Sequence, residues 1–182
     1  KAIKNSLNAW KAWSNTKLEQ RTTIFRKAAT LLAGKWRNKI NAATMLNQSK
    51  NAHQAEIDAA CELIDFFNLN STFAENINSK QDLVSPNDTK NYLEYRPLEG
   101  FIFAIAPFNF TSIAGNLPSA PALMGNVSLW KPASSAILAC HYLMEMLKEA
   151  GLPDGVINFL PGDGAVVGDP ILDHSELAGV HF

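Results

Sequence analysis

The chain has 182 residues, of which 47 % are hydrophobic and 18 % are charged, a composition that excludes an intrinsically disordered protein. Sixteen basic and 17 acidic side chains give a formal net charge of −1, so the sequence predicts no nucleic-acid partner and no membrane partner. No apolar stretch approaches the roughly 20 residues of a membrane-spanning helix, and the two cysteines lie too far apart in the sequence to suggest a disulfide framework.

The first 50 residues are predicted to be helical, because their apolar residues recur every three or four positions. The clearest run consists of Ile24, Phe25, Ala28, Leu31, Leu32 and Trp36. Basic side chains before residue 40 are interleaved with such apolar positions, which is typical of the solvated face of a helix.

A further helix is expected over 54–69. Asp58, Glu62 and Asp65 fall at i, i+4 and i+7, so they are predicted to form one acidic stripe. The stripe is either a solvated face or, because apolar residues flank it on both sides, a narrow polar strip. In the second case the Glu62 carboxylate is a candidate for binding an ammonium group.

Residues 78–91 are polar and rich in turn-forming types, so they are expected to connect a helical part to an α/β part. Tyr92–Arg96 is predicted to be a short exposed strand that Pro97 ends. The chain is therefore expected to consist of a helical segment (1–78), a connector with a short strand (79–99) and an α/β segment (100–182).

Strands and helices alternate after residue 100, which predicts an α/β fold with a parallel sheet and crossover helices. Strands are expected at 100–106, 126–130, 156–160 and 178–182. Helices are expected at 117–123, from a cap at Ser134 or Ser135 to Ala150, and at 165–172. The first of these helices is predicted to be short or irregular, because it contains Pro118 and Pro121.

Two polar side chains follow neighbouring strands of the predicted sheet, where open α/β sheets bind ligands. Asn109 comes after the first strand, and its carboxamide either stabilises an oxyanion or satisfies a turn. Lys131 ends the second strand, and its ammonium either binds a cofactor's ribose or phosphate or extends into solvent. We expect the carboxamide and the ammonium to point into one crevice.

The glycines of 162–168 (GDGAVVG) follow the third strand and precede a helix, which is the context of a phosphate-binding turn. Their spacing differs by one residue from the dinucleotide fingerprint, so a tight chain reversal explains them equally well. Cys61 and Cys140 lie among apolar residues and are predicted to be inert thiols. The four histidines show no metal-ligand spacing, so no metal site is predicted.

Four motifs resemble the aldehyde dehydrogenase superfamily: PFNFT at 107–111, APALMGN at 120–126, WKP at 130–132 and EAGLP at 149–153. The segment QAEIDAACELIDFF at 54–67 is similar, more narrowly, to the Δ1-pyrroline-5-carboxylate dehydrogenases, which oxidise L-glutamate γ-semialdehyde to L-glutamate in proline degradation. The resemblance implies a Rossmann-like NAD-binding domain, with 1–78 as its N-terminal helical part and 100–182 as its first βα units. It also implies NAD-dependent oxidation of a small-molecule aldehyde through a cysteine thiohemiacetal.

By position, the resemblance implies that Asn109 holds the oxyanion together with a backbone N–H and that Phe110 lies beside the substrate. Glu62 matches an acidic residue at the aldehyde site. Ala106 matches a position that contacts the cofactor, and Lys131 matches the lysine that reaches the adenosine ribose.

Ser134 stands where many relatives have an acidic residue that binds the ribose hydroxyls, so NADP is possible beside NAD. The family's Thr-Gly-Ser turn, general-base glutamate and nucleophilic cysteine do not occur among these residues. The chain is therefore expected to be an N-terminal fragment without the catalytic domain, inactive on its own.

A full-length parent is expected to form a homo-oligomer, in the cytoplasm of a bacterium or in the mitochondrial matrix of a eukaryote. Two alternatives stay open from the sequence: a non-catalytic nucleotide-binding module and another aldehyde dehydrogenase subfamily.

Overall fold

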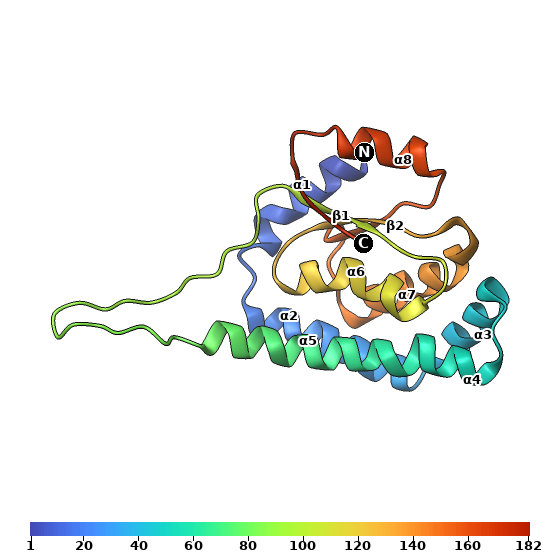
Figure 1. Cartoon of the computed structure of the whole chain (residues 1–182), viewed down its shortest axis with the longest axis horizontal. Coiled ribbons are helices and arrows are strands. Elements are labelled where there is room, and N and C mark those ends of the chain that lie inside the picture. The colour runs from blue at the N-terminus through green and yellow to red at the C-terminus, as the bar shows by residue number, and fades with distance from the viewer.

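A four-stranded parallel sheet forms the centre of the computed structural model, which describes residues 1–182 (Figure 1). The strands are β1 (Phe101–Ile105), β2 (Ser128–Lys131), β3 (Ile157–Phe159) and β4 (Leu177–His181). Their spatial order is β3-β2-β1-β4, so the chain steps outward twice and then returns to the other side of β1. This reversal is a topological switch point, where open α/β sheets bind ligands beyond the carboxyl ends of their strands. The predicted parallel α/β sheet is confirmed.

Helices cover both faces of this sheet (Figure 1). α1 (Ala2–Trp13) packs on one face, where Figure 1 also shows α8 (Gly164–Leu172). On the other face lie α6 (Thr111–Leu123) and α7 (Ile137–Ala150).

An outer layer of helices packs on α6 and α7, as the figure shows below them (Figure 1). Its main members are α2 (Leu18–Ala33), α3 (Arg37–Gln48) and α5 (Glu62–Ser79). The helices expected over the first 50 residues are thereby confirmed. The core joins these layers to the sheet, and its largest fully buried side chains are Trp130, Phe25, Phe67, Phe101 and Phe103.

The helix expected over 54–69 is longer and less regular than its spacing predicts. A capping box at Asn51 begins α4 (Ala52–Ala55), which passes through the π-helix η1 (Glu56–Cys61) into α5. A π-helix has more residues per turn than an α-helix. Side chains after η1 therefore point in directions about the helix axis that differ from those of an uninterrupted α-helix. Asp58 and Glu62 are half-buried while Asp65 is exposed, so the predicted acidic stripe is split.

α6 begins earlier than predicted, at Thr111, and its two prolines do not shorten it. Pro121 has no N–H, so the carbonyl of Leu117 loses its partner within the helix. The ring nitrogen Nδ1 of His181, in β4, lies 2.8 Å from that oxygen and replaces the missing donor. A Cβ at Gly115 would lie 2.8 Å from Leu63 Cδ2, so glycine allows α6 to approach α5 closely.

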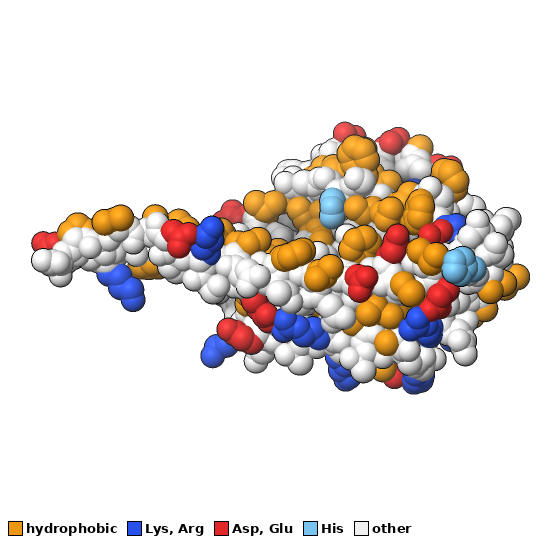
Figure 2. Space-filling model, turned by 60° about the horizontal axis from the view of Figure 1, so that its bottom comes forward, with side chains coloured by type: hydrophobic (Ala, Val, Ile, Leu, Met, Phe, Trp, Pro, Cys, Tyr) orange, Lys and Arg blue, Asp and Glu red, His pale blue; other side chains and the backbone are white.

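The prediction of a strand at Tyr92–Arg96 is wrong, because residues 80–99 form an irregular loop that projects from the molecule (Figure 1). The two arms of this loop are joined by hydrogen bonds between side-chain amides and the backbone, and not by the backbone–backbone hydrogen bonds of paired strands. The Gln81 side chain accepts from the Leu93 N–H at 2.7 Å and donates to the Leu93 carbonyl at 3.2 Å. Figure 2 shows hydrophobic side chains spread along the loop.

The prediction that Ser134 or Ser135 caps a helix is also wrong. Both lie in a 3₁₀ turn, η2 (Ser134–Ala136), and neither side chain caps η2 or the following α7. The predicted end of this helix is confirmed, since Gly151 closes α7 in the left-handed conformation with φ of 107°.

Candidate functional site

The loop that leaves β1 carries Asn109 to the start of α6. Asn109 is exposed, and its carboxamide makes no hydrogen bond within the chain. Phe110 follows as the residue preceding the first turn of α6 and has an extended backbone, with φ of −135°. The turn-satisfying role left open by the sequence therefore finds no support, because such an asparagine would bond to nearby backbone.

A lysine 59 positions earlier in the chain, Lys50, holds the backbone of this loop. Lys50 Nζ donates to the carbonyl oxygen of Asn109, pairs with Asp58 Oδ2 at 2.5 Å and lies 4.4 Å from the centre of the Phe110 ring. The side chains of Lys50 and Asp58 are only 13 % and 19 % exposed. In the sequence, Asp58 stands out only as part of the acidic stripe, and no pattern points to Lys50.

Glu62 lies against the first turn of α6. Its Oε2 accepts a hydrogen bond from Ser112 Oγ at 2.7 Å, and Ser112 itself is buried. A carboxylate is favoured at this end of a helix, where backbone N–H groups leave partial positive charge. The structure therefore brings Glu62 to the same helix start as Asn109 and Phe110.

Hydroxyl groups fix the same turn of α6 to α3. The buried Thr111 Oγ1 lies 2.8 Å from Thr44 Oγ1 and accepts from Gln48 Nε2 at 2.9 Å. Nothing in the spacing of these residues predicts their contact, because more than 60 residues separate the partners in the chain.

The three residues predicted to contact the cofactor lie at or just beyond the carboxyl ends of β1 and β2. Ala106 is buried directly after β1, and its N–H donates to the Lys131 carbonyl at 3.0 Å. Lys131 Nζ is half-buried and donates to the carbonyl of Pro132 at 3.2 Å. Ser134 is exposed and makes no side-chain hydrogen bond.

The expected crevice between Asn109 and Lys131 stays a prediction. The two strands are neighbours, with Ile105 opposite Lys131, as the sequence predicts. However, Asn109 is tied to Lys50, whereas Lys131 is close enough to Asp163 for its charge to help lower that carboxyl's pKa. None of the five principal cavities is lined by either side chain.

The glycine-rich turn before α8 is a helix cap and not a phosphate cradle. The Asp163 carboxylate accepts from the N–H groups of Ala165 at 2.9 Å and Val166 at 3.2 Å. These hydrogen bonds, that from Val166 first, lower the pKa of Asp163 below its ordinary value. The carboxylate occupies the donors that a phosphate would need and repels an anion.

The two cysteines are poor nucleophiles, but only Cys140 is buried as the sequence predicts, since Cys61 is half-buried beside Arg37 and Glu56. Burial raises the pKa of the Cys140 thiol to about 12. Burial and the neighbouring Glu56 carboxylate raise the pKa of Cys61. Both thiols are therefore neutral at physiological pH. No group of three or more histidine, cysteine or acidic side chains is placed to hold a metal ion.

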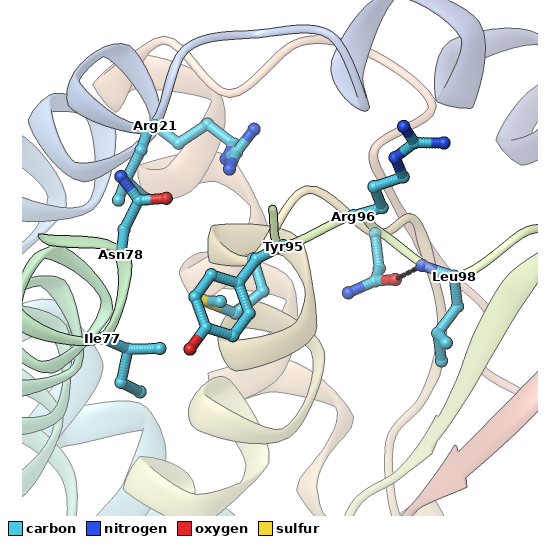
Figure 3. Close-up of a pocket in the computed structure, with 9 residues that line it drawn as sticks. Arg21, Ile77, Asn78, Tyr95, Arg96 and Leu98 are labelled. Carbon is cyan, nitrogen blue, oxygen red and sulfur yellow. Dashed lines mark hydrogen bonds between the residues drawn. The ribbon is translucent and has the colours of Figure 1, made fainter. Parts of the chain in front are cut away.

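A separate cavity of about 120 Å³ lies at the base of the projecting loop, away from the predicted residues (Figure 3). The buried Arg21 forms part of its wall and donates from Nε to the Leu123 carbonyl at 2.8 Å and from Nη1 to the Thr16 carbonyl. Burial lowers the pKa of Arg21. A guanidinium at the carboxyl end of α6 is stabilised by the helix dipole, so Arg21 has a structural role here.

None of the helices combines the length and the apolar character that crossing a membrane requires.

Comparison with known proteins agrees with the fold and the motifs. The sequence model of the aldehyde dehydrogenase family matches residues 1–182 of this chain. The mitochondrial delta-1-pyrroline-5-carboxylate dehydrogenases of Emericella nidulans and Rattus norvegicus are 49 % and 50 % identical to this chain. Each match covers 100 % of this chain and 32 % of the relative.

Among solved structures, the delta-pyrroline-5-carboxylate dehydrogenase from Mycobacterium tuberculosis bound with NAD is 52 % identical, with a TM-score of 0.97. That match covers 100 % of this chain and 34 % of the other. The chain thus spans about a third of the length of the relatives that it matches. Because the family model matches every residue and the sheet and helices superpose on such a structure, the chain belongs to the aldehyde dehydrogenase family.

Proposed function

We propose that this chain is part of an NAD-dependent dehydrogenase that oxidises L-glutamate γ-semialdehyde to L-glutamate in proline degradation. The observation that carries the proposal is the free carboxamide of Asn109, held beside the start of α6 by its own backbone contact to Lys50. Relatives named delta-1-pyrroline-5-carboxylate dehydrogenase, about half identical over the whole chain, support the choice of substrate.

In this proposal the Asn109 side chain donates an N–H to the aldehyde oxygen while negative charge develops on it. A fixed neutral donor stabilises that charge without first having to reorient. Glu62 binds the ammonium group of the amino-acid aldehyde, and the Phe110 ring packs beside the carbon chain. The nucleophile is assigned to neither cysteine of these 182 residues, because both thiols have a raised pKa.

The strand ends are suited to a dinucleotide. Ala106 is small and lies at the end of β1, so it offers little steric hindrance. Lys131 Nζ uses one N–H for the Pro132 carbonyl, which leaves two donors for ribose hydroxyls. NAD supplies the hydride acceptor when it is bound. Ser134 carries no charge, so nothing at this position repels the 2′-phosphate of NADP, and we propose that NADP is also accepted.

The division of the chain expected from the sequence is retained as part of the proposal. Residues 1–78 and 100–182 would both belong to the cofactor domain, linked by 79–99. We also propose that the full-length protein is a homo-oligomer, since the projecting loop exposes apolar side chains that a second subunit would cover. These are Leu83, Val84, Tyr92, Leu93 and Tyr95.

The test is turnover by the full-length protein that contains these residues. L-Glutamate γ-semialdehyde and a straight-chain aliphatic aldehyde are compared with NAD and with NADP, by absorbance of the reduced cofactor. We expect kcat/KM to favour the semialdehyde by on the order of 10²-fold, because the aliphatic aldehyde leaves Glu62 unpaired. Equal turnover of both aldehydes would assign the protein to another subfamily, and turnover of neither would refute the proposal.

A further inference from the structure

Lys50 contacts Asn109, Asp58 and Phe110, and the proposed function assigns it no role. It follows α3, precedes the capping box at Asn51 and reaches across to the loop after β1. We infer that Lys50 is a positioning residue that fixes the Asn109 loop for oxyanion binding, with Asp58 holding its ammonium in place. This inference rests on the proposed function, since only there does the position of Asn109 matter for turnover.

The contacts of Lys50 are those of an anchor and not of a surface lysine. Its ammonium bonds to the Asn109 carbonyl, pairs with Asp58 and faces the Phe110 ring at 4.4 Å. The three partners surround one charged group whose side chain is 13 % exposed. An ion pair that is largely buried adds little net stability, because each ion loses its hydration. It does restrict both side chains to a defined geometry.

The loop needs such an anchor because it has little structure of its own. Between the end of β1 and Thr111 the backbone belongs to no helix or strand, and the Asn109 side chain has no internal hydrogen bond. Holding the Asn109 carbonyl fixes the peptide plane, and holding the Phe110 ring fixes the next side chain. A misplacement of about 1 Å at such a site costs on the order of 10²-fold in rate.

The experiment uses steady-state kinetics of the full-length protein with NAD and the semialdehyde. Lys50→Met is expected to lower kcat by about 10-fold while leaving the Kd for NAD unchanged, since the ribose contacts lie elsewhere. Lys50→Arg, which keeps the charge and the contact with the Phe110 ring, is expected to restore part of kcat. The control is Lys39→Met, because Lys39 Nζ also faces an aromatic ring, 3.9 Å from the centre of the Tyr142 ring, but contacts α7 through Tyr142 and Glu145.

A double variant shows whether Lys50 acts through Asn109. In an Asn109→Ala background, adding Lys50→Met is expected to change kcat by less than about 2-fold, because the group being positioned is already gone. A further 10-fold loss in that background would overturn the inference and leave the proposed function intact. A wild-type kcat for Asn109→Ala alone would instead reject the proposed role of Asn109.

Lys50→Met leaves Asp58 half-buried without its partner, so a loss of activity alone could reflect misfolding. The double variant Lys50→Met with Asp58→Asn removes both charges and keeps the fold testable by its melting temperature. We expect this variant to melt near the wild type and still to show the reduced kcat. A wild-type kcat in this folded variant would overturn the inference.

Discussion

The residues proposed to face the aldehyde and those proposed to face the ribose are held in different ways. Lys50, Asp58, Glu62, Asn109 and Phe110, here called the substrate half, are tied to one another or to α6 by side-chain contacts. Ala106, Lys131 and Ser134, here called the ribose half, are placed by the strand ends and the following turn, and no hydrogen bond joins their side chains.

This difference shows which half depends on side chains. In the substrate half, two segments distant in sequence, 50–62 and 109–110, supply one cluster, so each side chain constrains its neighbours. In the ribose half, the hydrogen bond from Ala106 N–H to the Lys131 carbonyl sets the geometry through the backbone. Substitutions are therefore expected to have large effects in the first half and small ones in the second.

The largest effect is expected for Asn109→Ala in the full-length protein. Loss of one oxyanion donor lowers kcat by roughly 10²-fold or more, while the Kd for NAD stays nearly unchanged. Asn109→Asp is the matched variant, because it keeps the shape but replaces the N–H donor with a carboxylate. A kcat within 2-fold of the wild type in either variant would contradict the expectation that substitutions in the substrate half have the larger effects.

A smaller effect is expected for Glu62→Gln, which keeps the hydrogen bond to Ser112 but removes the charge. We expect kcat/KM for the semialdehyde to fall by about 10-fold, since a charged hydrogen bond to the ammonium is lost. The aliphatic aldehyde, which has no ammonium, should lose little. Asp65→Asn on the same helix is the control, because Asp65 is exposed, and an equal loss there would show a general charge effect.

Lys131→Met probes the ribose half. The KM for NAD is expected to rise by about 3- to 10-fold with kcat nearly unchanged, because one or two hydrogen bonds to a solvated ribose are lost. Lys148→Met, an exposed lysine on α7, is the control. A loss of kcat as large as that of Asn109→Ala would show that both halves act on the chemical step.

The smallest effect concerns the pH dependence of stability in η1, the element that carries Asp58. Arg37, with help from Asn41, holds the pKa of Glu56 in η1 below its ordinary value of 4.5. A lowered folded-state pKa adds stability above pH 4.5, and that stability is lost as the pH falls through the folded value.

Glu56→Gln removes this contribution. The difference in melting temperature between wild type and variant should therefore be largest near pH 6 and shrink below pH 4. A difference that is constant across this range would show that Glu56 contributes no charge-dependent stability.

The sheet could be predicted from sequence because each of its strands is a short apolar run bounded by turn residues. Asn109 and Lys131 could be placed at strand ends for the same reason, and the sequence motifs pointed to Glu62. Lys50 could not be found, since it contacts a residue 59 positions away and no local pattern reports such a pair. The regular course of α6 through its prolines could not be predicted, because His181, from a distant strand, supplies the donor that Pro121 lacks.

The π-helix η1 implies a constraint on the length of this part of the chain. It contains one residue more than an α-helix needs to join the same two ends. A deletion of Ala59 could therefore be absorbed as regular helix, yet it would change the angle between Asp58 and Glu62 about the helix axis. Insertions and deletions in η1, more than changes of residue type, are therefore expected to move Glu62 away from the position that it holds relative to Asp58.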